Sequence, residues 1–310
     1  MNSITVIIPV KNAESQIEKC LSAVVNQSIL PKEIILVDGY STDKTVDIAK
    51  KYSVKIIYED FGTVGGAREI GVENASNAYI AFTDADCIPD VDWLKNLLEE
   101  FGDNVIGVGG CTKNIGDGLW EVTISNVLDT FLGSAMSVQD RCHKKRHSVK
   151  SISGCNSIYR RSDIIKVGGF KTDYYINEDT DLNQRLLKFG KIVYTPDAIV
   201  FHDQKRNLLQ FIRRMILFGY GRGKHKLWDF QVIPPFLALI VFFSAFFWFE
   251  FFIVMLLLYF GIVIFFSVII FTKTKKLMLL FTTPIVFCIE HISYTFGFFK
   301  GLFSSKGRIQ

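Results

Sequence analysis

The sequence lacks the cysteine spacing of a metal or redox motif. Its six cysteines are scattered over 310 residues and include no Cys-x-x-Cys pair, so we expect reduced thiols in a cytoplasmic domain, with neither disulfides nor zinc. We also expect no signal peptide, because Met1-Asn2-Ser3 leads directly into a strand-like run. The net charge of +4 is small for this length, and no nucleic-acid partner is expected.

Charge is almost absent from the last quarter of the chain. Residues 232–271 contain one charged residue, Glu250, and 19 of the 28 phenylalanines follow residue 229. Forty helical residues rising about 1.5 Å each would extend roughly 60 Å, about twice the apolar thickness of a bilayer. We therefore expect two membrane crossings, near 233–249 and 251–271, with Glu250 at the turn.

A third apolar stretch, 277–299, can cross the membrane, re-enter it or lie on its surface. The lysines at 273–276 satisfy the positive-inside rule if they share the cytoplasmic side with the catalytic residues. A third crossing would then put the basic end, from Lys300 to Arg308, on the opposite side. Glu290 and His291 lie within the stretch, and we expect them to contact protein or lipid headgroups rather than acyl chains.

Acidic residues are missing between Lys205 and Lys226, where seven lysines and arginines interleave with apolar residues. This pattern predicts an amphipathic helix on an anionic membrane surface. Its candidate contacts with the acceptor or the membrane are Gln210, Arg213 and Arg214.

The first two-thirds of the chain alternates short apolar strands with helices. Strands are expected at 4–8, 33–37, 54–58 and 78–82, separated by helices that begin near residues 15, 44 and 66. Such alternation predicts a mostly parallel sheet with helices on both faces. Ligands of these sheets bind at the carboxyl ends of the strands.

Polar groups occur at those strand ends. Asp38 can accept hydrogen bonds from a base or ribose, or it can form an Asx-turn. Arg68, after Gly65-Gly66 at a helix start, can bind a phosphate or form a surface ion pair. Asp84 and Asp86 follow the fourth strand one residue apart, a pattern that suits Mg²⁺ or Mn²⁺ beside a substrate phosphate or, alternatively, a turn followed by a helix cap.

These motifs, in their order and spacing, carry a resemblance. They are Ile7-Ile8-Pro9-Val10-Lys11-Asn12, Val37-Asp38-Gly39-Tyr40-Ser41-Thr42-Asp43, Gly66-Ala67-Arg68-Glu69-Ile70-Gly71 and Asp84-Ala85-Asp86. They resemble the family 2 glycosyltransferases of GT-A fold over roughly residues 1–225, with Lys11 where the family often has Tyr. The resemblance implies a nucleotide-diphosphate-sugar donor, a divalent ion (Mn²⁺ or Mg²⁺) and inversion at the anomeric carbon.

The resemblance also implies roles by position. Donor binding falls to Pro9, Val10, Asn12, Asp38, Arg68, Asp84, Ala85 and Gly154. Metal binding falls to Asp86, Asp84 and His202. Glu178-Asp179 resembles the family's Glu-Asp motif, which implies that Asp179 takes the proton from the attacking hydroxyl and that Glu178 supports the acceptor. Acids in a first helical turn can also act as caps, which explains Asp181 better than these two.

We therefore predict an α/β protein with a GT-A (Rossmann-like), mostly parallel sheet domain at 1–204, a basic interfacial helix at 205–230 and a transmembrane region at 231–310 with two or three helices. The expected protein is a multi-pass enzyme of the cell membrane with a cytoplasmic catalytic domain. It would move a sugar, with a hexose favoured, from a UDP-sugar rather than a GDP-sugar to a polyprenyl phosphate or lipid-linked saccharide.

Other readings of the sequence stay open. The main alternative is a non-catalytic nucleotide-sugar sensor or scaffold at the membrane, against which the intact Glu178-Asp179 pair argues. A transport component is a third, and the nearly charge-free crossings argue against it. Gln210 and Arg213 match part of the Gln-x-x-Arg-Trp motif of processive synthases, but Arg214 replaces its Trp, and a homo-oligomer stays open.

Overall fold

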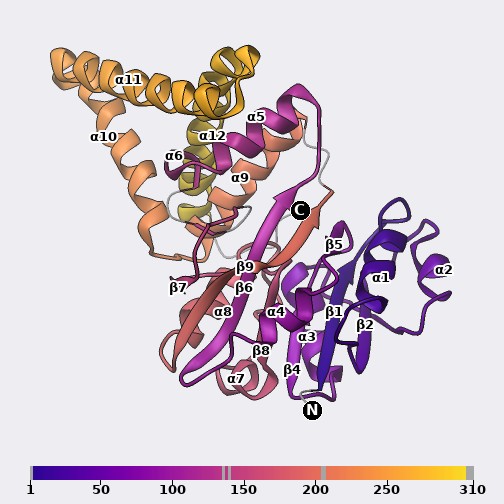
Figure 1. Ribbon diagram of the computed structural model, residues 1–310. Coiled ribbons are helices and arrows are strands. Elements are labelled where there is room, and N and C mark those ends of the chain that lie inside the picture. The colour runs from indigo at the N-terminus through magenta and orange to yellow at the C-terminus, as the bar shows by residue number, and fades with distance from the viewer. Residues whose placement is uncertain (1–2, 135–136, 139–140, 204–206, 305–310) are drawn as a thin grey trace. The chain divides into compact units, whose positions relative to one another are not determined.

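The computed structural model describes residues 3–134, 137–138, 141–203 and 207–304, which form two compact units (Figure 1). The sheet unit comprises residues 1–115 and 137–204, and the helical unit comprises 116–136 and 205–310. Residues 116–136, which lie within the range predicted for the catalytic domain, thus group with the C-terminal helices.

The sheet unit contains every strand that the described residues form. These are β1 (Ile4–Val10), β2 (Glu33–Asp38), β3 (Lys55–Tyr58), β4 (Tyr79–Phe82), β5 (Cys87–Pro89), β6 (Val105–Asn114), β7 (His147–Val149), β8 (Ser157–Arg160) and β9 (Lys191–His202). Its helices are α1 (Ile17–Val25), α2 (Thr45–Ala49), α3 (Val64–Asn74), α4 (Trp93–Leu98), α7 (Arg161–Lys166) and α8 (Glu178–Leu186).

The strands form one sheet in the order β3-β2-β1-β4-β8-β6-β9-β5, with β7 paired to β9. The predicted parallel pairing of the first strands is confirmed: β1 pairs with β2 and β4, and β2 with β3. The sheet as a whole is mixed, because β8 runs antiparallel to both β4 and β6. β5 forms immediately after Asp86 and pairs with the end of β9, which places Cys87 opposite His202.

Both faces of the sheet are covered by helices. Along β1, Val6 and Ile8 lie in the core that contains α1 and α4. Ile7, between them, points to the other face and lies in the core with α3 and α8. Successive strand residues alternate faces, so a run of buried residues on β1 fills both cores. The parallel strands β1, β2 and β4 end at the same edge of the sheet, and the polar residues that follow them lie there.

The expectation of six reduced cysteines is wrong for Cys111 and Cys142, which form a disulfide. Cys111 lies on β6, and Cys142 precedes β7. Both β6 and β7 pair with β9, so the sheet brings together two residues that are 31 positions apart in the chain. Sequence spacing alone carries no sign of this pairing.

The helical unit consists of α5 (Leu119–Leu128), α6 (Phe131–Ser134), α9 (Leu208–Lys224), a 3₁₀ turn η1 (Phe230–Val232), α10 (Ile233–Phe247), α11 (Phe249–Thr274) and α12 (Leu277–Leu302). Within the described part of the chain, three segments are long and apolar enough to span a membrane, Phe230–Phe247, Phe249–Thr274 and Leu277–Leu302. Their mean hydropathies are 2.1, 3.0 and 1.5. The predicted break between the first two falls at Trp248, two residues before Glu250.

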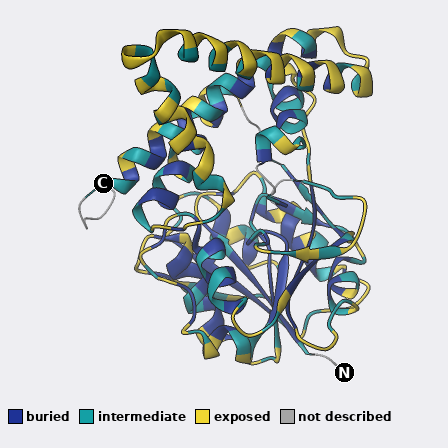
Figure 2. Cartoon of the chain, turned by 90° about the vertical axis from the view of Figure 1, so that its left-hand side faces the viewer, coloured by how far each residue is buried: buried dark blue, intermediate teal, exposed yellow. Residues whose placement is uncertain are grey.

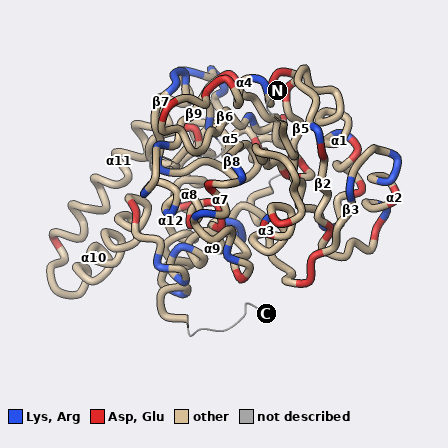
Figure 3. The backbone as a smooth tube through the Cα atoms, turned by 90° about the horizontal axis from the view of Figure 1, so that it is seen from below, with Lys and Arg blue, Asp and Glu red and all other residues tan. Residues whose placement is uncertain are grey.

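Apolar side chains cover α10 and α11. Most of their length is exposed (Figure 2), and almost no charge lies along it (Figure 3). Phe247, for example, is 87% exposed. Apolar surface of this extent is expected to face lipid or another protein rather than water. α12 differs, because 39% of its apolar segment is buried within the protein.

Glycines bring α12 against α9 with backbone contact. A Cβ added at Gly219 would collide with the carbonyl of Tyr294, and one added at Gly297 would collide with the carbonyl of Ile216. Gly223 and Gly301 repeat this arrangement one turn later on the two helices. Small residues at four-residue spacing are a common means of close helix packing in membranes.

The polar residues predicted within the third apolar stretch contact protein. A ring nitrogen of His291 lies 2.9 Å from the Tyr259 hydroxyl, and the other lies 3.3 Å from the Leu132 carbonyl oxygen. Glu290 is 6% exposed. The protein contact expected for His291 is thus confirmed. Of the basic residues that would follow a third crossing, Lys306 and Arg308 lie outside the described residues.

Candidate active site

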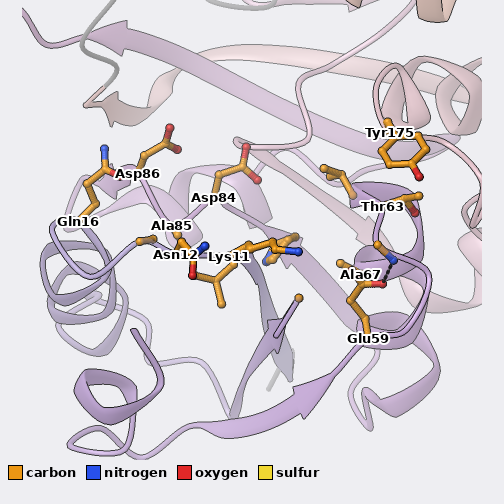
Figure 4. Close-up of a pocket in the computed structure, with 16 residues that line it drawn as sticks. Lys11, Asn12, Gln16, Glu59, Thr63, Ala67, Asp84, Ala85, Asp86 and Tyr175 are labelled. Atoms are coloured by element: carbon orange, nitrogen blue, oxygen red, sulfur yellow. Dashed lines mark hydrogen bonds between the residues drawn. The ribbon is translucent and has the colours of Figure 1, made fainter. Parts of the chain in front are cut away.

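A cleft of about 390 Å³ opens in the sheet unit at the carboxyl ends of β1 and β4 (Figure 4). The predicted site residues that line it are Pro9, Val10, Asn12, Asp84, Ala85 and Asp86. The other lining residues include Lys11, Gln16, Gly39, Glu59, Thr63, Ala67 and Tyr175. The prediction that ligand chemistry collects where these strands end agrees with this placement.

Arg68 joins the two acidic motifs. It lies in the second turn of α3, is 3% exposed, and donates from Nη2 to Asp84 Oδ1 at 2.9 Å and from Nη1 to Glu178 Oε1. One guanidinium thus bridges a strand end and a helix start that are 94 residues apart, from 84 to 178. Burial raises the pKa of Glu178 to about 7; the charge of Arg68 opposes this rise, and the nearby Asp179 adds to it.

Gly154 is the residue that makes room for this guanidinium. A Cβ at this position would overlap the Cζ and both terminal nitrogens of Arg68. The Gly154 N–H also donates to Asp179 Oδ2 at 3.0 Å. The absence of a side chain at Gly154 therefore leaves space for the Arg68 guanidinium, and its backbone N–H binds the Asp179 carboxylate.

Asp179 is the partly exposed member of its pair. Its Oδ1 accepts the N–H of Thr180 at 2.6 Å, while Oδ2 accepts that of Gly154. Glu178 beside it is only 5% exposed. Asp181, one residue beyond Thr180, forms an ion pair with Arg185 at 2.6 Å, which is a local contact within the helix. Backbone donors thus orient the carboxylate of Asp179 without burying it.

Asp86 and His202 form the second half of the site. His202 Nε2 lies 3.2 Å from Asp86 Oδ2, and the pairing of β5 with β9 holds the two residues together. Two ligands bound at about 2.1 Å on adjacent octahedral positions lie roughly 3.0 Å apart. The pair therefore fits a divalent ion. Asp84, the third predicted ligand, contacts Arg68 through its Oδ1.

A profile of the family described as glycosyl transferase family 2 matches residues 5–168, which is more than half of the chain. The chain belongs to glycosyl transferase family 2. It is therefore a glycosyltransferase, as the order and spacing of its motifs predicted.

Curated relatives of this glycosyltransferase include two archaeal enzymes. The dolichyl N-acetyl-alpha-D-glucosaminyl phosphate 3-beta-D-2,3-diacetamido-2,3-dideoxy-beta-D-glucuronosyltransferase of Methanococcus voltae is 28% identical over 72% of this chain and 74% of its own. Glycosyltransferase AglE of Haloferax volcanii is 29% identical over 73% and 74%. The O-antigen chain rhamnosyltransferase RfbN of Salmonella typhimurium is 30% identical over 64% and 66%.

Solved structures show the same fold. The mannosyltransferase PcManGT from Pyrobaculum calidifontis, solved with GDP-Man and Mn²⁺, has a TM-score of 0.60 at 18% identity, over 93% of this chain and 86% of its own. TarS 1-349 of S. aureus in complex with UDP has a TM-score of 0.51 at 20% identity, over 70% and 64%. The predicted GT-A fold is confirmed by these likenesses.

The carboxylate of Asp38 in this glycosyltransferase accepts hydrogen bonds from Ser41, three residues further along its own loop, rather than from the residue two positions on that an Asx-turn would use. It is fully buried, its Oδ1 accepts the Ser41 hydroxyl at 2.5 Å, and its Oδ2 accepts the Ser41 N–H at 2.9 Å. Asn12 joins the same loop, since its Oδ1 accepts the N–H of Thr42 at 2.8 Å. Within the loop that follows β2, Gly39 is the described residue that lines the cleft, and Asp38 does not line it.

Sequence reasoning missed Glu59 and Tyr175 as cleft residues. Glu59 is 4% exposed, accepts the Gly62 N–H at 2.9 Å and directly follows β3. An acid at the end of the third strand was a readable signal, of the same kind as Asp38 after the second. Lys11 lay within a quoted motif but received no role. Tyr175, three residues before Glu178, had no signal in the sequence.

The three residues predicted to meet the acceptor or membrane lie on α9 of the helical unit. Gln210 caps the helix, because its side chain accepts the Asn207 N–H at 3.0 Å while Asn207 accepts the Gln210 N–H at 2.9 Å. Arg213 is exposed, and the guanidinium of Arg214 lies 5.1 Å from the ring centroid of Phe218. A helix is thus present over Leu208–Lys224, within the range 205–230 that was predicted as a basic interfacial helix.

Proposed function

We propose that this family 2 glycosyltransferase transfers a sugar, with inversion, from a nucleoside diphosphate sugar to a lipid-linked acceptor at the cytoplasmic membrane face. The observation that carries the proposal is the bridge made by Arg68. It ties Asp84, on the wall of the cleft, to the turn that holds Asp179. A carboxylate held by backbone donors and a metal-binding pair are the two groups that such a transfer needs.

In this mechanism the partly exposed carboxylate of Asp179 accepts the proton of the acceptor hydroxyl. The N–H groups of Gly154 and Thr180 orient that carboxylate. Asp86 and His202 would hold Mn²⁺ or Mg²⁺, which when bound neutralises charge on the departing diphosphate. If the acceptor is a phosphate that is already ionised, it needs orientation more than a base, and Asp179 contributes less to the transfer.

The nucleotide is assigned to the part of the cleft lined by Lys11, Asn12 and Glu59. The buried carboxylate of Glu59 suits an N–H or hydroxyl donor of a base or ribose, and Lys11 supplies a positive charge for phosphate. A uridine nucleotide is favoured over guanosine. UDP and GDP-Man occur in the structures of TarS and PcManGT, so both nucleotide classes belong in the test.

The acceptor is assigned to the membrane because the chain carries long apolar helices in addition to its catalytic fold. The Methanococcus relative is named for a dolichyl phosphate-linked sugar, which supports the same class of acceptor here. We propose that the sheet unit carries the chemistry and that the helical unit anchors it, with Gln210, Arg213 and Arg214 at the headgroup level. The lysines at 273–276 then face the cytoplasm.

The test uses the full chain, purified in detergent with Mn²⁺ and a panel of UDP- and GDP-sugars. Nucleoside diphosphate release is followed with and without polyprenyl phosphate or a lipid-linked saccharide, and nuclear magnetic resonance gives the anomeric configuration of the product. We expect release that requires one donor, metal and lipid, with an inverted product. Donor binding without release with any lipid would contradict the proposal and favour a sensor.

Two neighbouring acids provide the matched comparison. Asp179→Asn is expected to lower the rate of transfer to a hydroxyl acceptor about 10²–10⁴-fold, as loss of a general base does. Asp181→Asn changes an acid two positions away that is paired with Arg185, and it should retain transfer within a few fold. Equal losses in the two variants would contradict the role given to Asp179.

A further inference from the structure

A group of sulfur and nitrogen ligands adjoins Asp86. Cys87 on β5, Cys155 before β8 and His202 at the end of β9 each contribute one ligand atom, and these atoms all lie within 4.8 Å of one another. The three residues are 0%, 4% and 2% exposed. They are separated by 68 and 47 positions (87 to 155, 155 to 202), so no spacing in the sequence marks them.

The framework around these residues is rigid. Cys87 and His202 are direct partners in the β5–β9 ladder. Cys155 is followed by Asn156, whose side-chain amide donates to the carbonyl oxygens of Cys111 and Ala198, both at 3.0 Å, and accepts the indole N–H of Trp93 at 2.8 Å. The three ligands are therefore held by strands and by a buried hydrogen-bond network rather than by a loose loop.

The spacing suits a tetrahedral ion. Zinc–sulfur bonds of about 2.3 Å place two thiolates of a tetrahedral site roughly 3.8 Å apart, so groups within 4.8 Å of one another need only a modest closure. Asp86 adjoins two members of this group, since its Oδ1 lies 3.8 Å from Cys87 Sγ and its Oδ2 lies 3.2 Å from His202 Nε2, which makes it the candidate for a fourth ligand. Asp86 also lines the cleft, which provides the entry path.

We propose that Cys87, Cys155, His202 and Asp86 form a site for a thiophilic divalent cation of the zinc class. Thiolates and imidazole select such ions over Mg²⁺ and Mn²⁺, which prefer oxygen. Binding converts both thiols to thiolates and releases their two protons to solvent. Because His202 and Asp86 are also the residues proposed for the catalytic ion, occupancy by zinc excludes that ion and inhibits transfer. This last step rests on the proposed function, whereas the binding does not.

The binding test uses Co²⁺ as a spectroscopic probe on the full chain in detergent under argon. We expect one Co²⁺ per chain with cobalt–thiolate charge-transfer absorption, which one equivalent of Zn²⁺ abolishes. Cys87→Ser and Cys155→Ser should lose this absorption. Cys20→Ser is the matched control, because Cys20 is a fully buried thiol of the same unit whose Sγ donates to the Asp84 carbonyl oxygen at 3.4 Å, and it should keep the absorption.

Wild-type protein without thiolate absorption would overturn the site whatever the variants do. Absorption that persists in both Cys87→Ser and Cys155→Ser would overturn it as well. Neither outcome depends on turnover, so a failure of the proposed transferase activity leaves this test intact.

The inhibition is tested separately, by adding Zn²⁺ to the Mn²⁺-supported reaction. Each variant is compared with its own rate before zinc. We expect the two serine variants to need at least about tenfold more Zn²⁺ than wild type for half inhibition, in line with the affinity lost when a metal site is impaired. Full activity at Zn²⁺ concentrations that displace Co²⁺ would overturn the exclusion of the catalytic ion.

Discussion

In both acidic motifs of the sheet unit, the two carboxylates have different partners. After β4, Asp84 is bound to Arg68 and Asp86 to His202. At the start of α8, Glu178 is bound to the same Arg68, and Asp179 to the N–H of Gly154. We infer that in each pair one carboxylate serves the framework and the other serves the chemistry. The presence of two acids in a motif therefore does not mean that both of them act on the substrate.

The difference lies in how far each framework acid is buried. The side chain of Glu178 is 7% exposed and that of Asp84 is 34% exposed. A buried carboxylate depends on its cation far more than an exposed one does. Removal of Arg68 should therefore lower the stability of the protein mainly through Glu178. Asp84 can be solvated from the cleft that it lines.

Removal of Arg68 breaks its ion pairs with Asp84 and Glu178 at once and should have the largest effect on stability. Arg68→Met leaves Glu178 buried without its partner, which we expect to cost about 3–5 kcal/mol of stability. The measurement is the thermal midpoint of the full chain in detergent. Arg146→Met is the matched control: its ion pair with Glu100 has a 54% exposed arginine, and exposed pairs contribute about 0–1 kcal/mol. Similar midpoints for the two variants would refute the bridging role.

Metal binding distinguishes the roles of the two acids that follow β4, Asp84 and Asp86. Asp86→Asn changes the proposed ligand next to His202, and Mn²⁺ affinity should fall by at least about 10–100-fold, the loss that follows when only a group supporting a ligand is changed. Asp84→Asn changes the residue that contacts Arg68 and should alter Mn²⁺ affinity less. Titration calorimetry with Mn²⁺ compares the two, and a weaker effect of Asp86→Asn than of Asp84→Asn would reverse the assignment.

Gly154 allows a subtler change, because it touches both halves of the second pair. Gly154→Ala puts a methyl group into the Arg68 guanidinium, and overpacking of this kind costs about 1–3 kcal/mol. Gly102→Ala is the matched control in the same unit, since nothing lies within 4 Å of its added Cβ. A thermal midpoint of Gly154→Ala that equals that of Gly102→Ala would show that the guanidinium is not packed on this glycine.

The stability of the protein should also depend on pH through Glu178. Burial raises the pKa of Glu178 to about 7, above the 4.5 of an exposed Glu, so the folded protein binds this proton more tightly than the unfolded chain. The contribution of Glu178 to stability is then full below about pH 4.5 and falls as the pH rises to about 7. Without added metal, the thermal midpoint of wild type should fall relative to that of Glu178→Gln between pH 5 and 8. A constant difference over that range would contradict the shift.

Much of the site could be predicted because it follows from local patterns. The ends of β1, β2 and β4 can be read from apolar runs, and parallel strands bring those ends to one edge. The acids after β4 and at the start of α8 were identified by motif. The family was likewise identified from the order of these segments, and the profile match confirms it.

The pairing of the side chains could not be predicted, because it depends on contacts between distant segments. The sequence left open a phosphate contact and a surface ion pair for Arg68, and the fold buries it between Asp84 and Glu178. For Asp38 the sequence left open a contact with a base or ribose and an Asx-turn, and the fold pairs its carboxylate with Ser41, three residues on. Cys111 and Cys142 form their bond across strands that are brought together by a third, β9.

The most direct measurement is turnover and thermal midpoint for Asp179→Asn and Glu178→Gln side by side, with donor and Mn²⁺ saturating and a hydroxyl-bearing acceptor. The division of labour predicts that Asp179→Asn loses turnover at an unchanged midpoint, whereas Glu178→Gln shifts the midpoint and retains far more turnover. If Glu178→Gln abolished turnover at an unchanged midpoint while Asp179→Asn remained active, the assignment of the two acids would be contradicted.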